Sequence, residues 1–211
     1  MKYSDGRPVE IAFLIEISSK FLQMFLNEKG RTSVKNDGLM PSALSGPVLD
    51  FLMPKITLLG NGGAIWILAA VILLCTKKYR RQGILLLVGL VAGVLVGNAC
   101  LKNLIARPRP CWLDSSVQLL IANPADYSFP SGHTLSSVIG ATGLTKTNRR
   151  FGYAAIPLAA LIAFSRLYLY VHFPSDVLAA AVLGVALGEL VWRCGGKLLE
   201  RWHAPRGRQR A

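Results

Sequence analysis

Long uncharged apolar runs, separated by short basic clusters, dominate this sequence. The first clear run covers residues 56–75 and contains no charged side chain. A helix of that length reaches ~30 Å, which is the thickness of the hydrocarbon core of a bilayer. A second run covers residues 83–101, where Asn98 is the one strongly polar side chain. The pattern is typical of an integral membrane protein and excludes a disordered basic chain, which would be poor in large apolar residues.

Three further segments are predicted to complete the bundle, over residues 131–148, 151–165 and 177–192. The first is polar for a membrane helix, because its central part, residues 134–145, contains Thr and Ser. It crosses a bilayer only if the helix extends to both ends of the longer range. We therefore predict an all-α fold, a polytopic transmembrane helix bundle with five clear spans. The chain is expected to form a single domain, residues 1–211, around a membrane-embedded core at residues 56–194.

Residues 9–26 form a different kind of segment, in which Glu16, Lys20 and Gln23 recur at helical spacing among apolar residues. This spacing predicts an amphipathic helix. The helix either lies in the membrane interface or forms a sixth span whose polar stripe faces the bundle. Residues 27–50 contain Gly, Ser, Pro and mixed charges, which is typical of a connecting loop.

Basic residues cluster after the first span, after the third and after the last, at residues 77–81, 146–150 and 195–211. If the helices cross in alternation, all three clusters lie on one side, which the positive-inside rule makes cytoplasmic. Topology and attraction to anionic lipid headgroups then explain the formal net charge of +13. We therefore predict the bilayer as a partner, and no nucleic acid.

The opposite side receives two loops, residues 102–131 and 166–176. The loops hold three cations whose donors suit the oxygens of a phosphate group, namely Lys102, Arg109 and Arg166. Ser131 and Gly132 precede a helix whose unpaired N–H groups and dipole also favour an anion. A phosphate-binding site is therefore predicted on this side. Arg107, in the first loop, is explained equally well as an interfacial anchor.

His172 and Asp176 are four residues apart in the second loop, and His133 closes the first. The carboxylate can accept a hydrogen bond from one ring nitrogen of His172 and leave the other nitrogen unprotonated. His133 is then available to give a proton to a leaving oxygen. The arrangement predicts phosphoryl transfer with a histidine nucleophile. The alternative is Ser131 or Ser165 as the nucleophile, with the histidine and carboxylate pair as its base.

Three motifs lie between residues 102 and 176. K-x6-R-P begins at Lys102, P-S-G-H ends at His133, and S-R-x5-H-x3-D ends at Asp176. Together they resemble the signature of the type 2 phosphatidic acid phosphatase superfamily, with no departure at a defining position. The resemblance implies a bacterial membrane lipid phosphate phosphatase, similar to phosphatidylglycerophosphatase B and undecaprenyl-diphosphatase.

The same resemblance implies a role for each candidate residue. His172 is expected to attack phosphorus and form a phosphohistidine, and Asp176 to hold His172. His133 is expected to protonate the leaving group and then to activate water. The phosphate is expected to be bound by Lys102, Arg109, Ser131, Gly132 and Arg166. No metal and no other cofactor is expected, and the expected partner is a membrane lipid phosphate or diphosphate.

Two other functions are alternatives. In the first, the substrate is a water-soluble phosphate ester, as in sugar phosphatases. Vanadate-dependent haloperoxidases share the motifs, but they are soluble proteins, whereas this sequence is typical of a membrane protein. A transport module that binds phospholipid headgroups without hydrolysis is the alternative from another class. Both histidines and Asp176 are present, which favours the enzyme. The motifs specify phosphate, and leave open which lipid carries it and the oligomeric state.

Overall fold

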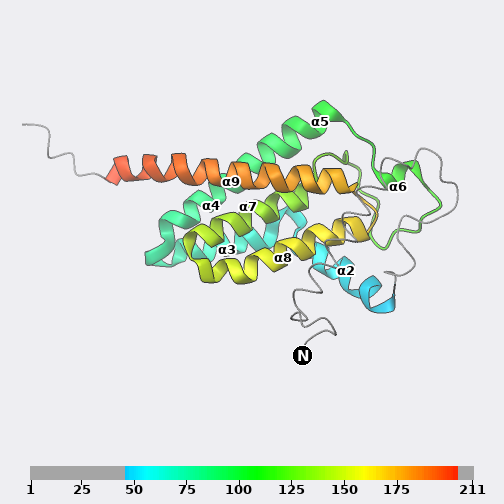
Figure 1. Cartoon of the computed structure of the whole chain (residues 1–211), viewed down its shortest axis with the longest axis horizontal. Coiled ribbons are helices and arrows are strands. Elements are labelled where there is room, and N and C mark those ends of the chain that lie inside the picture. The colour runs from blue at the N-terminus through cyan, green and yellow to red at the C-terminus, as the bar shows by residue number, and fades with distance from the viewer. Residues whose placement is uncertain (1–45, 204–211) are drawn as a thin grey trace, which may run out of the picture. The chain divides into compact units, whose positions relative to one another are not determined.

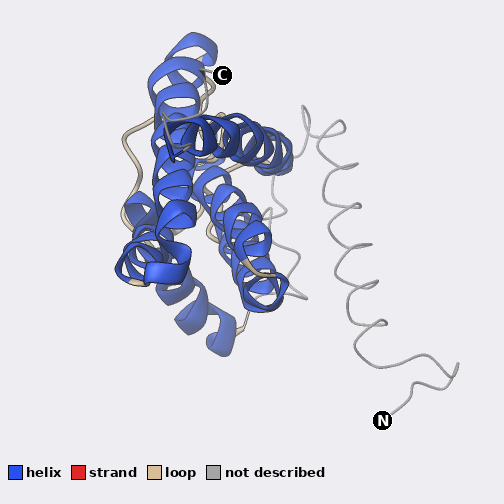
Figure 2. Ribbon diagram, turned by 90° about the vertical axis from the view of Figure 1, so that its left-hand side faces the viewer, coloured by secondary structure: helices blue, strands red, loops and turns tan. Residues whose placement is uncertain are grey.

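The computed structural model describes residues 46–203, and every regular element in that range is helical (Figures 1 and 2). The all-α class is confirmed for this part of the chain. The predicted amphipathic helix at residues 9–26 lies outside the described residues, as does the end of the basic tail, residues 204–211. The elements are α2 (Pro47–Leu59), η2 (Asn61–Gly63), α3 (Ala64–Cys75), η3 (Lys77–Tyr79), α4 (Arg80–Gly93), the π-helix η4 (Val94–Leu101), α5 (Lys102–Ile105), α6 (Pro110–Leu113), α7 (Gly132–Thr147), α8 (Arg149–Tyr168) and α9 (Pro174–His203).

Three segments of the described chain are long and apolar enough to cross a membrane, and a bent pair of helices is a fourth candidate. The three segments are Lys77–Leu113, Arg149–Tyr168 and Pro174–Lys197. They correspond to the second, fourth and fifth predicted spans. The third predicted span is α7, an unbroken helix of 16 residues, which is shorter than the ~20 residues that a spanning helix needs.

The apolar run at residues 56–75 is not one helix, contrary to the prediction. It contains the break between α2 and α3, where the chain bends by 44°. Gly62 and Gly63 have φ values of 58° and 73°, a left-handed backbone conformation that costs other residues ~1–2 kcal/mol. These glycines let the chain leave α2 and start α3 in a new direction. α2 itself begins at Pro47, inside the predicted loop.

α7 packs against α4, α8 and α9 in the described bundle, and Figure 1 shows it between α8 and α9. Leu135 and Ile139 of α7 belong to the main hydrophobic cluster, together with Trp66 of α3 and Ile162 of α8. One polar residue of α7 has a partner on another helix, since Ser137 Oγ accepts a hydrogen bond from Trp66 Nε1 at 3.0 Å. Thr145 and Thr147 donate instead to carbonyl oxygens of α7 itself. Neighbouring helices rather than lipid cover much of α7, which explains how a helix rich in Gly, Ser and Thr fits this position.

The second predicted span changes its helical form as it approaches the candidate site. α4 continues as η4, in which hydrogen bonds run from residue i to i+5, and then as the short α5. η4 contains Asn98 and ends directly before Lys102, so Lys102 lies in a helix and not in a loop as predicted. Arg166 likewise lies in the last turn of α8. Both cations are therefore held by regular structure, which positions a side chain more firmly than a loop does.

Candidate active site

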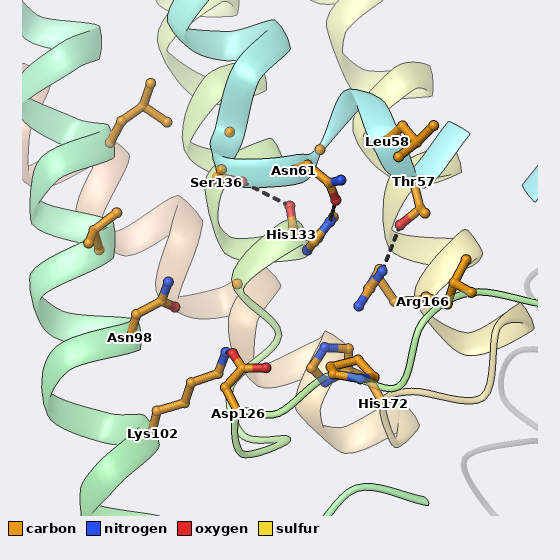
Figure 3. Close-up of a pocket in the computed structure, with 18 of the residues that line it drawn as sticks. Thr57, Leu58, Asn61, Asn98, Lys102, Asp126, His133, Ser136, Arg166 and His172 are labelled. Carbon is orange, nitrogen blue, oxygen red and sulfur yellow. Dashed lines mark hydrogen bonds and ion pairs between the residues drawn. The ribbon is translucent and has the colours of Figure 1, made fainter. Parts of the chain in front are cut away.

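A cavity of about 880 Å³ lies between α2, η4 and the N-terminal end of α7 (Figure 3). Its polar end is lined by Lys102, Arg109, Asp126, His133, Arg166 and His172. The remaining wall is apolar and comes mainly from α2, α3, α4 and η4. The structure thus brings residues from all three sequence motifs to one cavity.

Ser131 and Asp176 lie behind the wall of this cavity and are fully buried. Ser131 caps α7, because its Oγ accepts a hydrogen bond from the N–H of Thr134 at 3.4 Å. Its own N–H donates to the carbonyl oxygen of Asp176 at 3.3 Å. Gly132 lies against Asn98 of η4, and a Cβ added to Gly132 would come within 3.0 Å of Asn98 Oδ1. The start of α7 is therefore packed closely against both η4 and the beginning of α9.

Arg166 presents an incompletely bonded guanidinium to the cavity (Figure 3). The residue is only 4% exposed, and its Nη1 donates to Thr57 Oγ1 of α2 at 2.7 Å. Its Nε is buried and has no hydrogen-bond partner within the described structure. Burial of a charged donor without a partner is unfavourable. An anion in the cavity would neutralise the charge of this buried guanidinium.

Arg109 joins segments that are distant in the sequence. Its Nη1 donates to the carbonyl oxygen of Val171 at 2.7 Å and lies 3.2 Å from Nε2 of His172. Its Nε donates to the carbonyl oxygen of Asp126 at 2.6 Å. Arg109 is only 2% exposed. Its contacts on both sides hold the His172 ring in a defined position relative to the loop that precedes α7.

The two ring nitrogens of His172 have different neighbours. A guanidinium only donates, so Nε2 accepts from Arg109 and the ring proton lies on Nδ1. Burial lowers the pKa of His172 to about 4; the charges of Arg109 and Arg166 act in the same direction, and Asp176 opposes them. His172 is therefore neutral at pH 7, and the lone pair of its Nε2 accepts the hydrogen bond from Arg109.

Ser128 lies between His172 and Asp176, where a direct hydrogen bond was predicted. Nδ1 of His172 lies 3.7 Å from Oδ2 of Asp176, which is beyond the usual N–H···O range. Ser128 Oγ donates to that Oδ2 at 2.5 Å and lies 3.4 Å from the Nδ1. The hydroxyl thus connects the ring to the carboxylate. Ser128 belongs to none of the three motifs, so the sequence carried no signal for it.

Asp176 receives two further hydrogen bonds. The N–H of Phe173 donates to it at 3.0 Å, and Arg107 Nη1 donates to it at 2.8 Å. Arg107 also donates to Ser175 Oγ and lies over the Phe173 ring, 4.0 Å from its centroid. Arg107 is therefore more than the interfacial anchor considered above, because it neutralises the buried carboxylate of the site.

His133 is held by the turn between α2 and α3. Its Nε2 lies 2.8 Å from Oδ1 of Asn61, and an amide oxygen only accepts, so this nitrogen carries a proton. Gly60 lies against the same ring, since a Cβ added to Gly60 would come within 2.7 Å of Cδ2 of His133. The sequence did not predict this contact; its only signal was the turn sequence Gly-Asn-Gly-Gly at residues 60–63.

Asp126 was not predicted, yet its carboxylate forms ion pairs with Lys102 and Arg109. Its Oδ1 accepts from Arg109 Nη2 at 2.6 Å. Burial raises the pKa of Asp126, but the hydrogen bonds and charges of Lys102 and Arg109 outweigh burial and lower the pKa to about 2. The side chain is therefore ionised, and it remains 56% exposed.

The ligand chemistry of the cavity suits an anion. Lys102, Arg109 and Arg166 line it, and Asp126 is the one carboxylate among the described residues that line it. Within residues 46–203, no group of three His, Cys, Asp or Glu side chains is placed to hold a metal ion.

Comparison with known proteins places these features in a family context. Residues 82–200 match the PAP2 superfamily. The chain is 36% identical over 121 residues to an undecaprenyl-diphosphatase of Sulfolobus acidocaldarius, which covers 57% of this chain and 58% of that protein. It is 30% identical over 146 residues to undecaprenyl-diphosphatase BcrC of Bacillus subtilis, which covers 69% of this chain and 75% of that protein.

A solved membrane protein has a similar fold. The crystal structure of a transmembrane PAP2 type phosphatidylglycerolphosphate phosphatase from Bacillus subtilis matches with a TM-score of 0.60 and 28% sequence identity. The match covers 74% of this chain and 81% of that chain.

Proposed function

Since this chain belongs to the PAP2 superfamily, we propose that it is an integral membrane phosphatase that hydrolyses a lipid phosphate or lipid diphosphate through a phosphohistidine. Family membership confirms the resemblance that the three motifs carry. The observation that supports the activity most directly is the neutral, buried His172, which lines a cavity with three cations and whose unprotonated Nε2 lies beside Arg109. An unprotonated nitrogen beside cationic groups is the arrangement that nucleophilic attack on a phosphate requires.

Phosphate binding is assigned to the cationic end of the cavity. Lys102, Arg109 and Arg166 line this end and neutralise the phosphate oxygens. Ser131 and Gly132 contribute the N-terminal end of α7, where the helix dipole favours an anion.

In the first chemical step Arg109 Nη1 gives up its contact with His172 Nε2, and this nitrogen attacks phosphorus. An N–P bond forms as the P–O bond to the leaving group breaks. His133, protonated on both nitrogens, gives its Nδ1 proton to the leaving oxygen while its Nε2–H stays bonded to Asn61. Asp176, through Ser128, holds the His172 ring with its Nδ1 proton directed away from the substrate. In the second step His133 takes a proton from water, the water oxygen attacks phosphorus, and the N–P bond breaks to release inorganic phosphate. No metal ion takes part in either step.

A lipid substrate is proposed because the cavity continues into an apolar wall. Leu58 of α2, Ile67 of α3 and Leu90 of α4 line it, and such a surface suits an acyl or isoprenoid chain. Lipids such as phosphatidylglycerol phosphate, phosphatidic acid and undecaprenyl diphosphate fit this description. A water-soluble phosphate ester would leave the apolar wall uncovered.

The proposed topology has five spans in the described chain. The bent pair α2 and α3 forms the first, and α7 crosses as an internal helix covered by its neighbours. The cavity then lies on the extracytoplasmic face, and the basic residues at 77–81, 146–150 and the C-terminal tail lie on the cytoplasmic face.

The proposal is tested with the full-length protein solubilised in detergent. We expect phosphate release from a panel of lipid monophosphates and diphosphates, unaffected by EDTA and inhibited by vanadate. After a rapid quench with ³²P-labelled substrate, wild-type protein should carry acid-labile, base-stable label, and His172→Ala should carry none. Label that persists in His172→Ala and is lost in Ser131→Ala would assign the nucleophile to serine. Binding of the lipids without any turnover would establish the transport module instead.

A further inference from the structure

The phosphate-binding cations already hold an anion of the chain itself, the carboxylate of Asp126. We propose that Asp126 is a displaceable internal counter-ion, which occupies Lys102 and Arg109 in the empty site, yields them to the substrate phosphate, and returns to expel inorganic phosphate. This inference rests on the proposed function, because it assigns a phosphate ligand to the same cavity. It makes Asp126 a determinant of anion affinity.

The bonding of Arg109 shows which of its contacts a ligand can take. Its Nε and Nη1 are tied to the main-chain carbonyl oxygens of Asp126 and Val171. Its Nη2 is held by the carboxylate of Asp126. A phosphate that engages Nη2 replaces a side chain and leaves the backbone contacts intact. Arg109 therefore remains in position while its ligand changes.

Lys102, like Arg109, is paired with the carboxylate of Asp126, which a ligand can replace. Its Nζ forms a hydrogen bond and an ion pair with Oδ2 of Asp126, the second oxygen of the same carboxylate. The two carboxylate oxygens thus take one cation each, as two oxygens of a phosphate group would. Asp126 stands in for the substrate at both ligands.

Asp126 is much more exposed than the two cations it pairs with, as displacement of its carboxylate by a ligand requires. The side chains of Lys102 and Arg109 are 8% and 2% exposed, whereas that of Asp126 is 56% exposed. Asp126 lies in the loop between α6 and α7, outside any helix. The carboxylate can therefore turn into water, where it is well solvated, while the buried cations keep their positions.

The carboxylate of Asp126 and a phosphate compete for the same cations, and the charges of the cavity determine how strongly. Lys102, Arg109 and Arg166 give the cavity three positive charges, and Asp126 reduces the sum to two. The fourth nearby cation, Arg107, is paired with Asp176. The low pKa of Asp126 keeps its carboxylate ionised at neutral pH. An incoming phosphate must thus compete with a charged group, and a leaving phosphate is pushed by one.

The test measures inhibition by inorganic phosphate and its direct binding by calorimetry, with the full-length protein in detergent. Asp126→Asn removes the competing charge and keeps the shape, so the Ki and Kd for phosphate should fall by about tenfold, a typical effect for one charge-assisted contact. Asp126→Ala should tighten phosphate binding in the same direction. Asp126→Glu keeps the charge and should stay near the wild-type value.

Asp114→Asn is the matched control, because Asp114 follows α6 at the start of the same loop. Among the described residues, its carboxylate accepts hydrogen bonds from Ser116 alone. This variant should leave the Ki unchanged. Unchanged or weaker phosphate binding in both Asp126→Asn and Asp126→Ala would overturn the inference and make Asp126 a residue that positions the cations. Tighter binding by a protein that hydrolyses none of the lipids would retain the counter-ion and refute the phosphatase.

Discussion

The two nitrogens of His172 have opposite roles, and each role follows from a neighbour. Nε2 faces Arg109, which cannot accept a proton, and Nδ1 faces Ser128 and Asp176, which can accept a hydrogen bond. The tautomer needed for attack is thus present before substrate binds.

The pH dependence of activity should report the environment of His172. Its pKa is lowered from the usual 6.5 to about 4, so the ring stays unprotonated at neutral and mildly acidic pH. The acidic limb of kcat/KM, corrected for ionisation of the substrate, should therefore fall as the pH drops through about 4. A limb near the ordinary histidine pKa would show that the ring is solvated in the working enzyme.

Ser128 should contribute to the rate rather than to binding. Ser128→Ala leaves the His172 ring 3.7 Å from the carboxylate with no bridging hydroxyl, so its orientation is less well defined. We expect kcat to fall by roughly 10- to 100-fold, as for other residues that orient a reactive group, with KM nearly unchanged. Ser116→Ala, an exposed serine of the same loop, is the control. Wild-type kcat in Ser128→Ala would mean that Asp176 acts on the ring without the serine.

The turn between α2 and α3 sets the direction of α3 and places Asn61 against His133. Gly62 has φ 58°, and no atom lies within 4 Å of a Cβ built on it. Gly62→Ala is therefore opposed by backbone strain alone, and should lower the free energy of unfolding by ~1 kcal/mol. Gly62→Asn should cost less, because asparagine adopts the left-handed conformation more readily. The thermal midpoints of both variants in one detergent test this order, and equal midpoints would contradict it.

The sequence was sufficient to predict most of the long helices and the motif residues of the site, but not the contacts between loops. Uncharged runs and positions of motifs were sufficient for α4, α8 and α9, and for the meeting of Lys102, Arg109, Arg166 and His172 at one cavity. The break at Gly60–Gly63 was hidden, because glycine is also common inside membrane helices. The contacts of Asn61, Asp126 and Ser128 depend on which loops meet in space, which local spacing does not specify.

The sidedness of the whole protein is a separate prediction. In a cysteine-free variant, a cysteine introduced at the exposed Ser116 should react with an impermeant maleimide in intact cells. A cysteine at the exposed Lys78 should react only after the cells are opened. The basic residues near Lys78 are assigned to the cytoplasm by the positive-inside rule. The reverse labelling pattern would invert the topology and leave the chemistry unchanged.

The apolar wall of the cavity reaches the outside of the helix bundle. Leu58, Val91 and Leu95 line the cavity and are also 59%, 57% and 58% exposed, so the cavity opens along a flank that faces lipid in the proposed topology. A substrate that arrives by this route is dissolved in the membrane and diffuses within its plane. Its effective concentration is its mole fraction in the surrounding lipid or detergent.

The rate on a lipid phosphate should therefore fall when inert detergent is added at constant total substrate, whereas the rate on a water-soluble aryl phosphate should not. Equal insensitivity of both rates would place the route through the aqueous side. With the lateral route, the composition of the surrounding membrane acts directly on turnover, because every neighbouring lipid dilutes the substrate.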